Sequence, residues 1–405
     1  MEQKTNIASD IPADDVLFIS LELGEHILRS GGEISRAEDT ITRICKAYGA
    51  VHVDVAAIWS MIALTVDFDD TRSTCTRRIT DSTSTNLDRL SRLNNLSRYI
   101  CANLPTKEEV VAKMKDINSA TIIKPARFIL GNMIGTAGFA FFFSNFGNGI
   151  TSEKLLIALL DGVLTGIISL PLCLLANYLS RTRTNPVIAK FVVCFLGGLS
   201  AILVGKLIPR SLRRRHNVGN FQALHGSYRR CRDSGRICSR DPYLGRCGMT
   251  DQLLRILLLL AATIVCCTGF SLVYGLRGRI IVFAVISSVI SCLAYEVAYL
   301  FGCGLFLSAM IASVLTAAYS DTMAHRIKVP ATMMIIVGIL PLVPGAKLYY
   351  TMLGAVQENM DMFYTNGEAA LLIAAGIAVG IIAVTALSKP INARISEINQ
   401  RKKQR

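Results

Sequence analysis

The chain has 405 residues, of which 52% are hydrophobic and 18% charged, and its mean hydropathy is +0.44. This composition is too apolar for a soluble protein of that length and excludes a purely water-soluble enzyme or binding protein. The formal charge of +14 is unevenly spread, since residues 1–118 hold 14 basic and 18 acidic side chains and nearly all long uncharged runs follow Lys124. We therefore predict an α-helical polytopic membrane protein with a small cytosolic α+β domain over residues 1–118.

The first 118 residues alternate between helical and strand periodicity. Apolar residues at helical spacing predict helices over Asp14–Ser30, Ile34–Ala47, Leu87–Asn103 and Lys107–Ile117. Alternation with period two predicts an antiparallel meander with strands at Val51–Val55, Ile62–Phe68 and, more weakly, Arg77–Thr80. The first 20 residues contain acids and a proline in place of a basic start and an apolar core, so we expect no signal peptide and a domain that stays in the cytosol.

The rest of the chain contains long apolar segments, and a helix of about 20 residues crosses a hydrocarbon core of about 30 Å. Eight spans are predicted, over Arg127–Ser144, Lys154–Leu174, Val187–Leu207, Leu253–Tyr274, Ile280–Leu300, Leu305–Tyr319, Thr332–Met352 and Ala369–Leu387. With both termini on the cytosolic side the number must be even, and eight or ten spans both remain open.

Basic side chains mark the cytosolic side of a membrane protein. Lys124 and Arg127 precede the first predicted span, and Arg181 and Arg183 follow the second. The tail over residues 391–405 ends in Arg-Lys-Lys-Gln-Arg and is expected to be cytosolic as well. We therefore predict a multi-pass protein of the inner (plasma) membrane with both termini in the cytosol.

The twelve cysteines are scattered and form no CxxC pair. Half of them lie within apolar runs, at Cys173, Cys194, Cys266, Cys267, Cys292 and Cys303. We interpret them as small buried hydrophobic residues, not as a disulfide framework, and we expect neither a metal site nor a cofactor.

Two motifs carry a resemblance to a known family. Residues 30–44 read Ser-Gly-Gly-Glu-Ile-Ser-Arg-Ala-Glu-Asp-Thr-Ile-Thr-Arg-Ile, followed by Tyr48-Gly49, and a second motif consists of Val329-Pro-Ala-Thr and Gly-Ile-Leu-Pro-Leu-Val-Pro-Gly at residues 338–345. In this order and spacing they resemble the threonine/serine exporter family over most of the chain. The resemblance implies a transporter and not an enzyme, which exports small hydroxy amino acids with the proton gradient from two fused membrane halves, over residues 119–275 and 276–390.

Other functions stay open beside this one. Split relatives imply an exporter of dicarboxylates such as succinate, and a membrane-anchored sensor or hydrolase could act through the N-terminal domain. The expected partners are a small amino acid, protons and the lipid bilayer, but no nucleic acid, and self-association into a homo-oligomer is left open.

The second motif predicts a break within a membrane span. Pro341 and Pro344 each remove a backbone hydrogen bond and clash with the preceding turn, and Gly345 follows them directly. Unpaired backbone costs several kcal/mol per group in hydrocarbon, so such a break is stable only against protein or a water-filled cavity. Transporters build substrate sites from broken helices, so we expect the break to line the substrate pathway, with a packing kink as the alternative. Lys347 could bind a substrate carboxylate or mark the membrane edge.

Two acidic residues fall within predicted spans. Asp161 lies in the second span, and Glu296 lies four residues before the end of the fifth. An ionised carboxylate at the centre of a span costs roughly 2.5 to 3.5 kcal/mol, and a neutral carboxylic acid avoids much of that cost. Each is therefore a candidate proton carrier, although an interfacial ion pair with Lys or Arg would also accommodate Glu296.

The cytosolic motif gathers charges at the start of a helix, at Glu33, Arg36, Glu38 and Asp39. Acids there are favoured by the helix dipole whatever the function, and Glu33 with Arg36 forms an ordinary i,i+3 pair. The family resemblance favours a role in gating or substrate access over a solvated face. A hydrolase site remains an alternative, although no GxSxG, HExxH or P-loop motif occurs.

Residues 210–248 depart from the family pattern. They contain ten arginines, no lysine and two aspartates, a net charge of +8, with sparse aromatic residues. A loop that binds nucleic acid or anionic lipid is one interpretation. A shifted reading frame accounts for the composition better, because Ile237–Asp241 can be encoded so that the frame one base earlier reads Asp-Leu-Leu-Ala-Gly, as the family would place there. Such a shift would remove one span from the first half.

Overall fold

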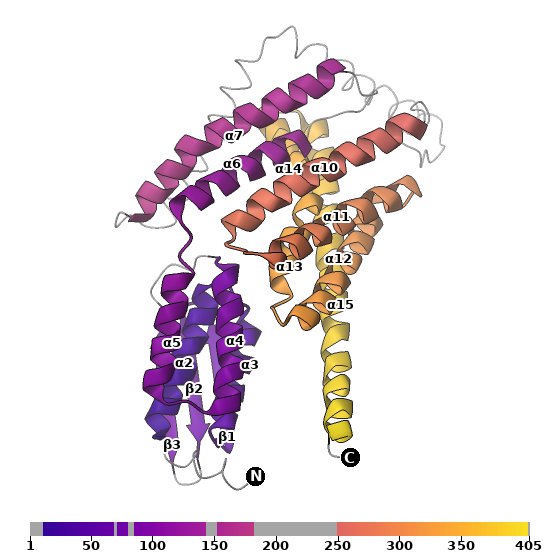
Figure 1. Ribbon diagram of the computed structural model, residues 1–405. Coiled ribbons are helices and arrows are strands. Elements are labelled where there is room, and N and C mark those ends of the chain that lie inside the picture. The colour runs from indigo at the N-terminus through magenta and orange to yellow at the C-terminus, as the bar shows by residue number, and fades with distance from the viewer. Residues whose placement is uncertain (1–10, 69–70, 80–84, 143–151, 182–248, 404–405) are drawn as a thin grey trace. The chain divides into compact units, whose positions relative to one another are not determined.

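The computed structural model describes residues 11–68, 71–79, 85–142, 152–181 and 249–403 (Figure 1). The chain divides into two compact units. The N-terminal unit comprises Met1–Lys124 together with Tyr274–Arg277 and His325–Met333, and the membrane unit comprises Pro125–Val273, Gly278–Ala324 and Met334–Arg405. The predicted fold class is confirmed, since the chain is mostly helical with apolar helices and one small sheet near the N-terminus.

The N-terminal unit contains four helices and a three-stranded antiparallel sheet among its described residues. The helices are α2 (Ala13–Arg29), α3 (Ile34–Ala47), α4 (Leu87–Asn103) and α5 (Lys107–Ala120). The strands β1 (His52–Ile58), β2 (Met61–Asp67) and β3 (Arg72–Arg78) lie in the order β1-β2-β3. Local signals set the helix ends: Gly31 adopts φ +85° after α2, and the side chain of Asn86 caps α4 by accepting the Arg89 amide at 3.1 Å.

The four helices lie close to their predicted bounds, but the strands differ in detail. Arg72–Arg78 forms the third strand, which lies earlier than the predicted Arg77–Thr80, and Phe68 falls beyond the end of β2. The pairing with β2 determines the position of β3, because Leu64 in β2 lies opposite Cys75 and Met61 lies opposite Arg78. The sequence of β3 has no hydrophobic alternation that could have located it.

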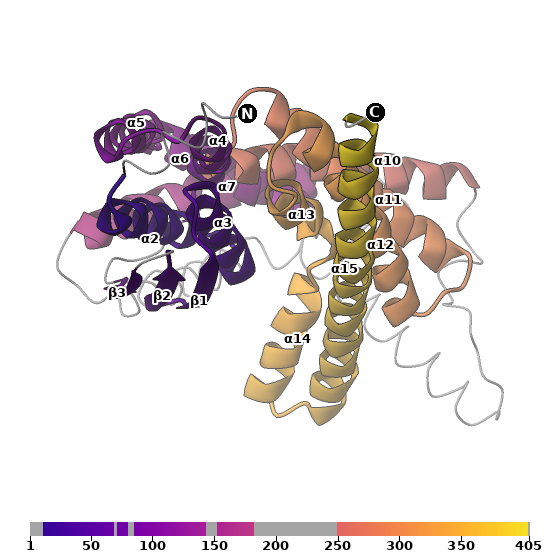
Figure 2. The ribbon, with the colours of Figure 1, turned by 90° about the horizontal axis from the view of Figure 1, so that it is seen from below.

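The elements of this unit form three layers, as Figure 2 shows. Helices α2 and α3 lie between the sheet and the pair α4–α5, so they have packing partners on both sides. The core follows from this arrangement, with fully buried side chains at Ile19, Leu23, Ile27, Ile41, Ile44, Ile62, Leu64, Leu90, Leu93 and Ile100. Tyr48 is buried at the end of α3, and its hydroxyl donates to the carbonyl of Pro105 at 2.6 Å.

The membrane unit is built of long apolar helices. They are α6 (Pro125–Phe142), α7 (Ser152–Arg181), α10 (Met249–Val273), α11 (Arg279–Leu300), α12 (Leu305–Ile327), α13 (Thr332–Gly338), the short 3₁₀ helix η1 (Leu340–Leu342), α14 (Gly345–Val356) and α15 (Met360–Lys403). Among the described residues, five helices are long and apolar enough to cross a membrane, within α7, α10, α11, α12 and α15. The bent pair formed by α13–η1 and α14 makes a sixth if it counts as one span.

The first predicted span is a helix, α6, but it is not among these five. The predicted span Val187–Leu207 and the basic stretch over residues 210–248 lie outside the described residues. Helix α12 continues to Ile327, so His325 and Arg326 lie in its last turn and not in a connection. Helix α7 runs through Pro171 to Arg181, and α15 begins at Met360, before the predicted Ala369.

Glycines bring α6 and α10 into backbone contact. A Cβ atom on Gly138 would lie 2.6 Å from the amide nitrogen of Cys266, and one on Gly131 would lie 2.9 Å from the carbonyl oxygen of Gly269. Small residues at spacings of three and four allow membrane helices to approach this closely. Helix α6 therefore depends on α10 for its packing in this unit.

Candidate functional site

The membrane unit contains a broken helix at the predicted position. Helix α13 ends at Gly338 and α14 begins at Gly345, and the two segments are bent by 51°. Pro341 lies in η1 and Pro344 is the N-terminal cap residue of α14. Short-range bonds replace the helical ladder, since the Leu342 amide donates to Ile339 at 2.9 Å and the Gly345 amide to Val343 at 2.7 Å.

Hydroxyl side chains fill the interior of the neighbouring helices. This hydroxyl cluster consists of Ser287, Ser288 and Ser291 in α11 and Ser313, Thr316 and Ser320 in α12, and all six residues are fully buried. The hydroxyls of Ser287 and Ser320 lie 3.0 Å apart and join the two helices. Thr316 donates to the carbonyl of Ala312 in its own helix at 2.7 Å, whereas Ser313 also reaches the carbonyl of Gly376 in α15 at 3.4 Å. The buried Ser291 hydroxyl has no hydrogen-bond partner among the described residues.

The end of α13 lies against this cluster. A Cβ atom on Gly338 would meet Thr316 Cγ2 at 2.7 Å and would also collide with Ser287. The absence of a side chain thus allows the last turn of α13 to touch both α11 and α12. The helix carries the negative end of its dipole there, next to side chains that can donate or accept hydrogen bonds.

The other face of the break borders a cavity of 1170 Å³ between α13–α14 and α15. Its lining is largely apolar and includes Ile339, Val343 and Pro344. Lys347 is exposed and is not among the residues that line this cavity. The break therefore separates an apolar side from a hydroxyl-rich side.

The two intramembrane acids have different surroundings. Asp161 is half-buried in α7, and its carbonyl accepts the Thr165 hydroxyl at 2.6 Å. Glu296 in α11 forms an ion pair with Arg255 of α10, with 3.7 Å between Oε2 and Nη2. Such a pair lowers the cost of an ionised carboxylate, and it is the arrangement expected of an interfacial residue.

The four charged residues of the first motif, Glu33, Arg36, Glu38 and Asp39, do not form one cluster. Glu33 is exposed at the N-terminal cap of α3, and Asp39 is exposed on the same helix. Glu38 accepts the backbone amide of Ala57 at 2.9 Å and so ties α3 to β1. The Arg36 Nε atom is buried without a hydrogen-bond partner, and no Glu33–Arg36 ion pair forms among the described residues.

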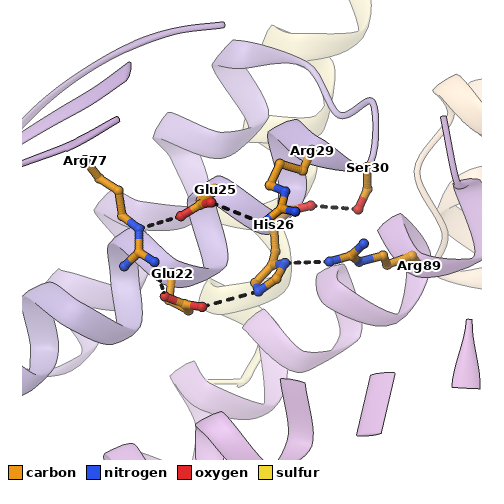
Figure 3. Close-up of polar contacts among 7 residues, drawn as sticks. All are labelled: Glu22, Glu25, His26, Arg29, Ser30, Arg77 and Arg89. Carbon is orange, nitrogen blue, oxygen red and sulfur yellow. Dashed lines mark hydrogen bonds and ion pairs between the residues drawn. The ribbon is translucent and has the colours of Figure 1, made fainter. Parts of the chain in front are cut away.

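A different charged network joins α2 to β3 and α4, as Figure 3 shows. Arg77 from β3 bridges two carboxylates, with Nη2 2.6 Å from Glu22 and Nε bonded to Glu25. Glu25 also pairs with Arg29 at 3.3 Å. His26 lies between Glu22, at 3.3 Å from its Nε2, and Arg89 of α4, at 2.6 Å from its Nδ1.

The contacts of His26 indicate which of its ring nitrogens donates and which accepts. A guanidinium can only donate, so Nδ1 accepts from Arg89 and Nε2 carries the hydrogen that faces Glu22. This hydrogen bond lowers the pKa of Glu22 below its ordinary value, and the charge of Arg77 acts in the same direction against the effect of burial. Burial and the charge of Arg29 lower the pKa of Arg89.

This network is suited to holding α2, α4 and β3 together. Both of its carboxylates are engaged by Arg77, and the described residues contain no group of His, Cys, Asp and Glu that could hold a metal. Sequence analysis missed the network because Arg77 and Arg89 reach α2 only through the fold. The repeated acids and histidine at Glu22, Glu25 and His26 were the available local signal.

The comparisons with known proteins agree with the motifs. Residues 19–224 match a family model of threonine/serine exporters, and residues 259–387 match a second model of the same exporters. No curated protein and no solved structure matches the chain. The first match includes the charged network, the second includes the broken helix and the hydroxyl cluster, and residues 225–258 lie in neither.

Proposed function

Because the chain belongs to the threonine/serine exporter family, we propose that it is a secondary transporter that exports threonine and serine across the inner membrane, coupled to the proton gradient. The observation that carries the proposal is the broken helix against the hydroxyl cluster. Broken membrane helices are the usual place for substrate sites in secondary transporters.

The chemistry of this place suits a small hydroxy amino acid. Buried hydroxyls can exchange a bond within their own helix for one to the substrate hydroxyl, and Ser291 offers a hydroxyl without a partner. The carbonyl end of α13 at Gly338 favours an ammonium group, and the start of α14 at Gly345 favours a carboxylate. The break thus provides a complementary group for each polar part of threonine or serine.

The other two functions are less well supported. A dicarboxylate needs cationic partners, whereas the hydroxyl cluster consists of uncharged serines and threonine. A hydrolase in the N-terminal domain needs a free base, whereas Glu22 and Glu25 are engaged by arginine.

Efflux measurements test the substrate and the coupling together. Membrane vesicles that contain the full chain should release labelled threonine and serine under an imposed pH gradient, and labelled succinate at no more than the rate of empty vesicles. Succinate release without threonine release would overturn the proposed substrate.

Asp161, which lies within the apolar segment Leu155–Leu179 of α7, is the proposed proton carrier. Asp161→Asn cannot gain or lose a proton, so we expect it to abolish gradient-driven threonine efflux and to leave threonine exchange intact. Asp361→Asn, a change of an exposed acid at the start of α15, is the matched control and should retain efflux. Undiminished gradient-driven efflux in Asp161→Asn would remove this residue from the mechanism.

The composition of the N-terminal unit supports the proposed orientation. Two further segments belong to the same unit as the N-terminal domain: Tyr274–Arg277, which follows α10, and His325–Met333, which runs from the last turn of α12 into the start of α13. The segments of one compact aqueous unit must lie on one side of the bilayer. Helix α11 therefore crosses the bilayer away from that side, and α12 crosses back to it. Reporters fused at residues 118, 275 and 329 should all report the cytosol, and periplasmic activity at any of them would contradict this topology.

A further inference from the structure

The connector between α10 and α11 is bound by the N-terminal domain. The connector has five residues, of which Tyr274–Arg277 belong to the N-terminal unit, and Leu276 among them is fully buried. The contacts of this connector attach it to two parts of the N-terminal domain, the start of α4 and the end of α5.

The first turn of α4 supplies one part of the attachment. The Leu87 amide, which as the first residue of a helix has no partner within it, donates to the carbonyl of Tyr274 at 3.0 Å. Asp88, which is buried, forms an ion pair with Arg277 at 3.5 Å and a second one with Arg92 at 3.4 Å. The connector therefore completes the hydrogen bonding of the helix that receives it.

The end of α5 supplies the other part. The Arg277 guanidinium donates to the carbonyl of Ala120 at 3.0 Å and to that of Ile122 at 3.4 Å. Asn86 donates to the intervening carbonyl of Thr121 at 2.8 Å. Three successive carbonyls of the segment that leads into α6 are thus held by side chains from α4 and from the connector.

These contacts join two places that are distant in the sequence. Residues 120–122 lead into α6, which begins at Pro125, and Tyr274 follows directly on α10. The same two helices touch through Gly131 and Gly138. We propose that the N-terminal domain clamps the entry to α6 and the exit from α10 together through Asp88 and Arg277, so that this helix pair is the fixed frame of the transporter.

The role of this clamp in transport rests on the proposed function. If α6 and α10 are held at their ends and along their contact, the movement that exposes the substrate site must occur in α11 to α15, which carry the hydroxyl cluster and the break. The clamp itself can be measured without any transport.

Hydrogen exchange of the full-length protein in detergent tests the clamp directly. In Arg277→Ala and in Asp88→Ala, exchange of the Leu87 amide and of the connector amides should become about tenfold faster. Local opening of this region then costs less free energy, because there is no Asp88–Arg277 ion pair left to break. The effect of the double variant should be smaller than the sum of the two single effects, because both changes remove the Asp88–Arg277 ion pair, beside the contacts that each change removes alone. The amide of Leu64 in β2 serves as the internal reference for a folded domain.

Arg92→Ala is the matched control, because it removes the other ion partner of Asp88 and leaves Arg277 in place. Unchanged exchange in the two single variants, or fully additive effects in the double one, would overturn the clamp. Threonine efflux is the second readout: Arg277→Ala should lower it about tenfold while Arg92→Ala does not. Faster exchange with normal efflux would refute the fixed frame, whereas absence of efflux in the unmodified protein would refute the proposed function and leave the exchange result valid.

Discussion

Replacing Pro341 and Pro344 by alanine should abolish threonine efflux while the protein remains folded in the membrane. Alanine restores the missing amide and removes the ring clash, so the 51° break between α13 and α14 can close into continuous helix. Closure would remove the opposed helix ends at Gly338 and Gly345, and with them the groups proposed to bind the ammonium and the carboxylate. We expect loss of at least about a hundredfold in rate, the effect of removing several positioned polar contacts.

Pro171→Ala is the control for this change, since Pro171 lies inside the continuous helix α7 and its replacement should leave efflux near normal. A single-cysteine scan over Leu340–Ala346, in a background without native cysteines, should find positions that a water-soluble thiol reagent labels and that threonine protects. Full efflux in the double-alanine variant, together with no labelled position in the cysteine scan, would show that the break is only a packing kink.

Removing the cation at the centre of the charged network should destabilise the N-terminal domain. Arg77→Met leaves Glu22 and Glu25, one turn apart on α2, without the guanidinium that bridges them, and we expect a loss of about 3 kcal/mol in the free energy of unfolding. The same change at Arg72, whose pair with Asp67 is exposed, should cost less than about 1 kcal/mol. Urea unfolding followed by fluorescence of Trp59, the single tryptophan of the chain, measures both.

The dependence of this stability on pH follows from Glu22. Its pKa is lowered in the folded domain from the ordinary 4.5, so the stabilisation is present above that pH and is lost as the pH falls below it. Arg77→Met should make this decline shallower, because part of the shift comes from Arg77. Equal losses for Arg77→Met and Arg72→Met, or identical pH profiles, would contradict the role of the network.

Local sequence patterns predicted much of the N-terminal domain. Helix α3 spans the predicted Ile34–Ala47 and α4 the predicted Leu87–Asn103, because in both an apolar face recurs at helical spacing and a turn signal marks the end. Strand β3 was misplaced because Arg72–Arg78 is polar and owes its conformation to pairing with β2. The pattern of one segment does not contain that information.

The candidate sites were predictable only where a residue type imposes its own geometry. Two prolines as closely spaced as Pro341 and Pro344 predict a break in any apolar helix. A buried serine such as Ser287, in contrast, cannot be told from any other small residue until the partner helix is known. The same holds for Arg277, whose ion partner Asp88 lies 189 positions away in the chain. Long-range pairing is a property of the fold and not of the local pattern.

Tyr48 belongs to the first family motif, yet its surroundings indicate that it stabilises the fold of the N-terminal domain. Its hydroxyl donates to Pro105, between α4 and α5, and burial raises its pKa to about 12. Since the ordinary value is 10.0, the neutral phenol stabilises the domain fully below that pH, and this contribution disappears as the pH rises towards 12. In strong alkali the ionisation of Tyr48 would therefore destabilise the folded domain. A residue of a family motif can thus serve to stabilise the fold of the N-terminal domain.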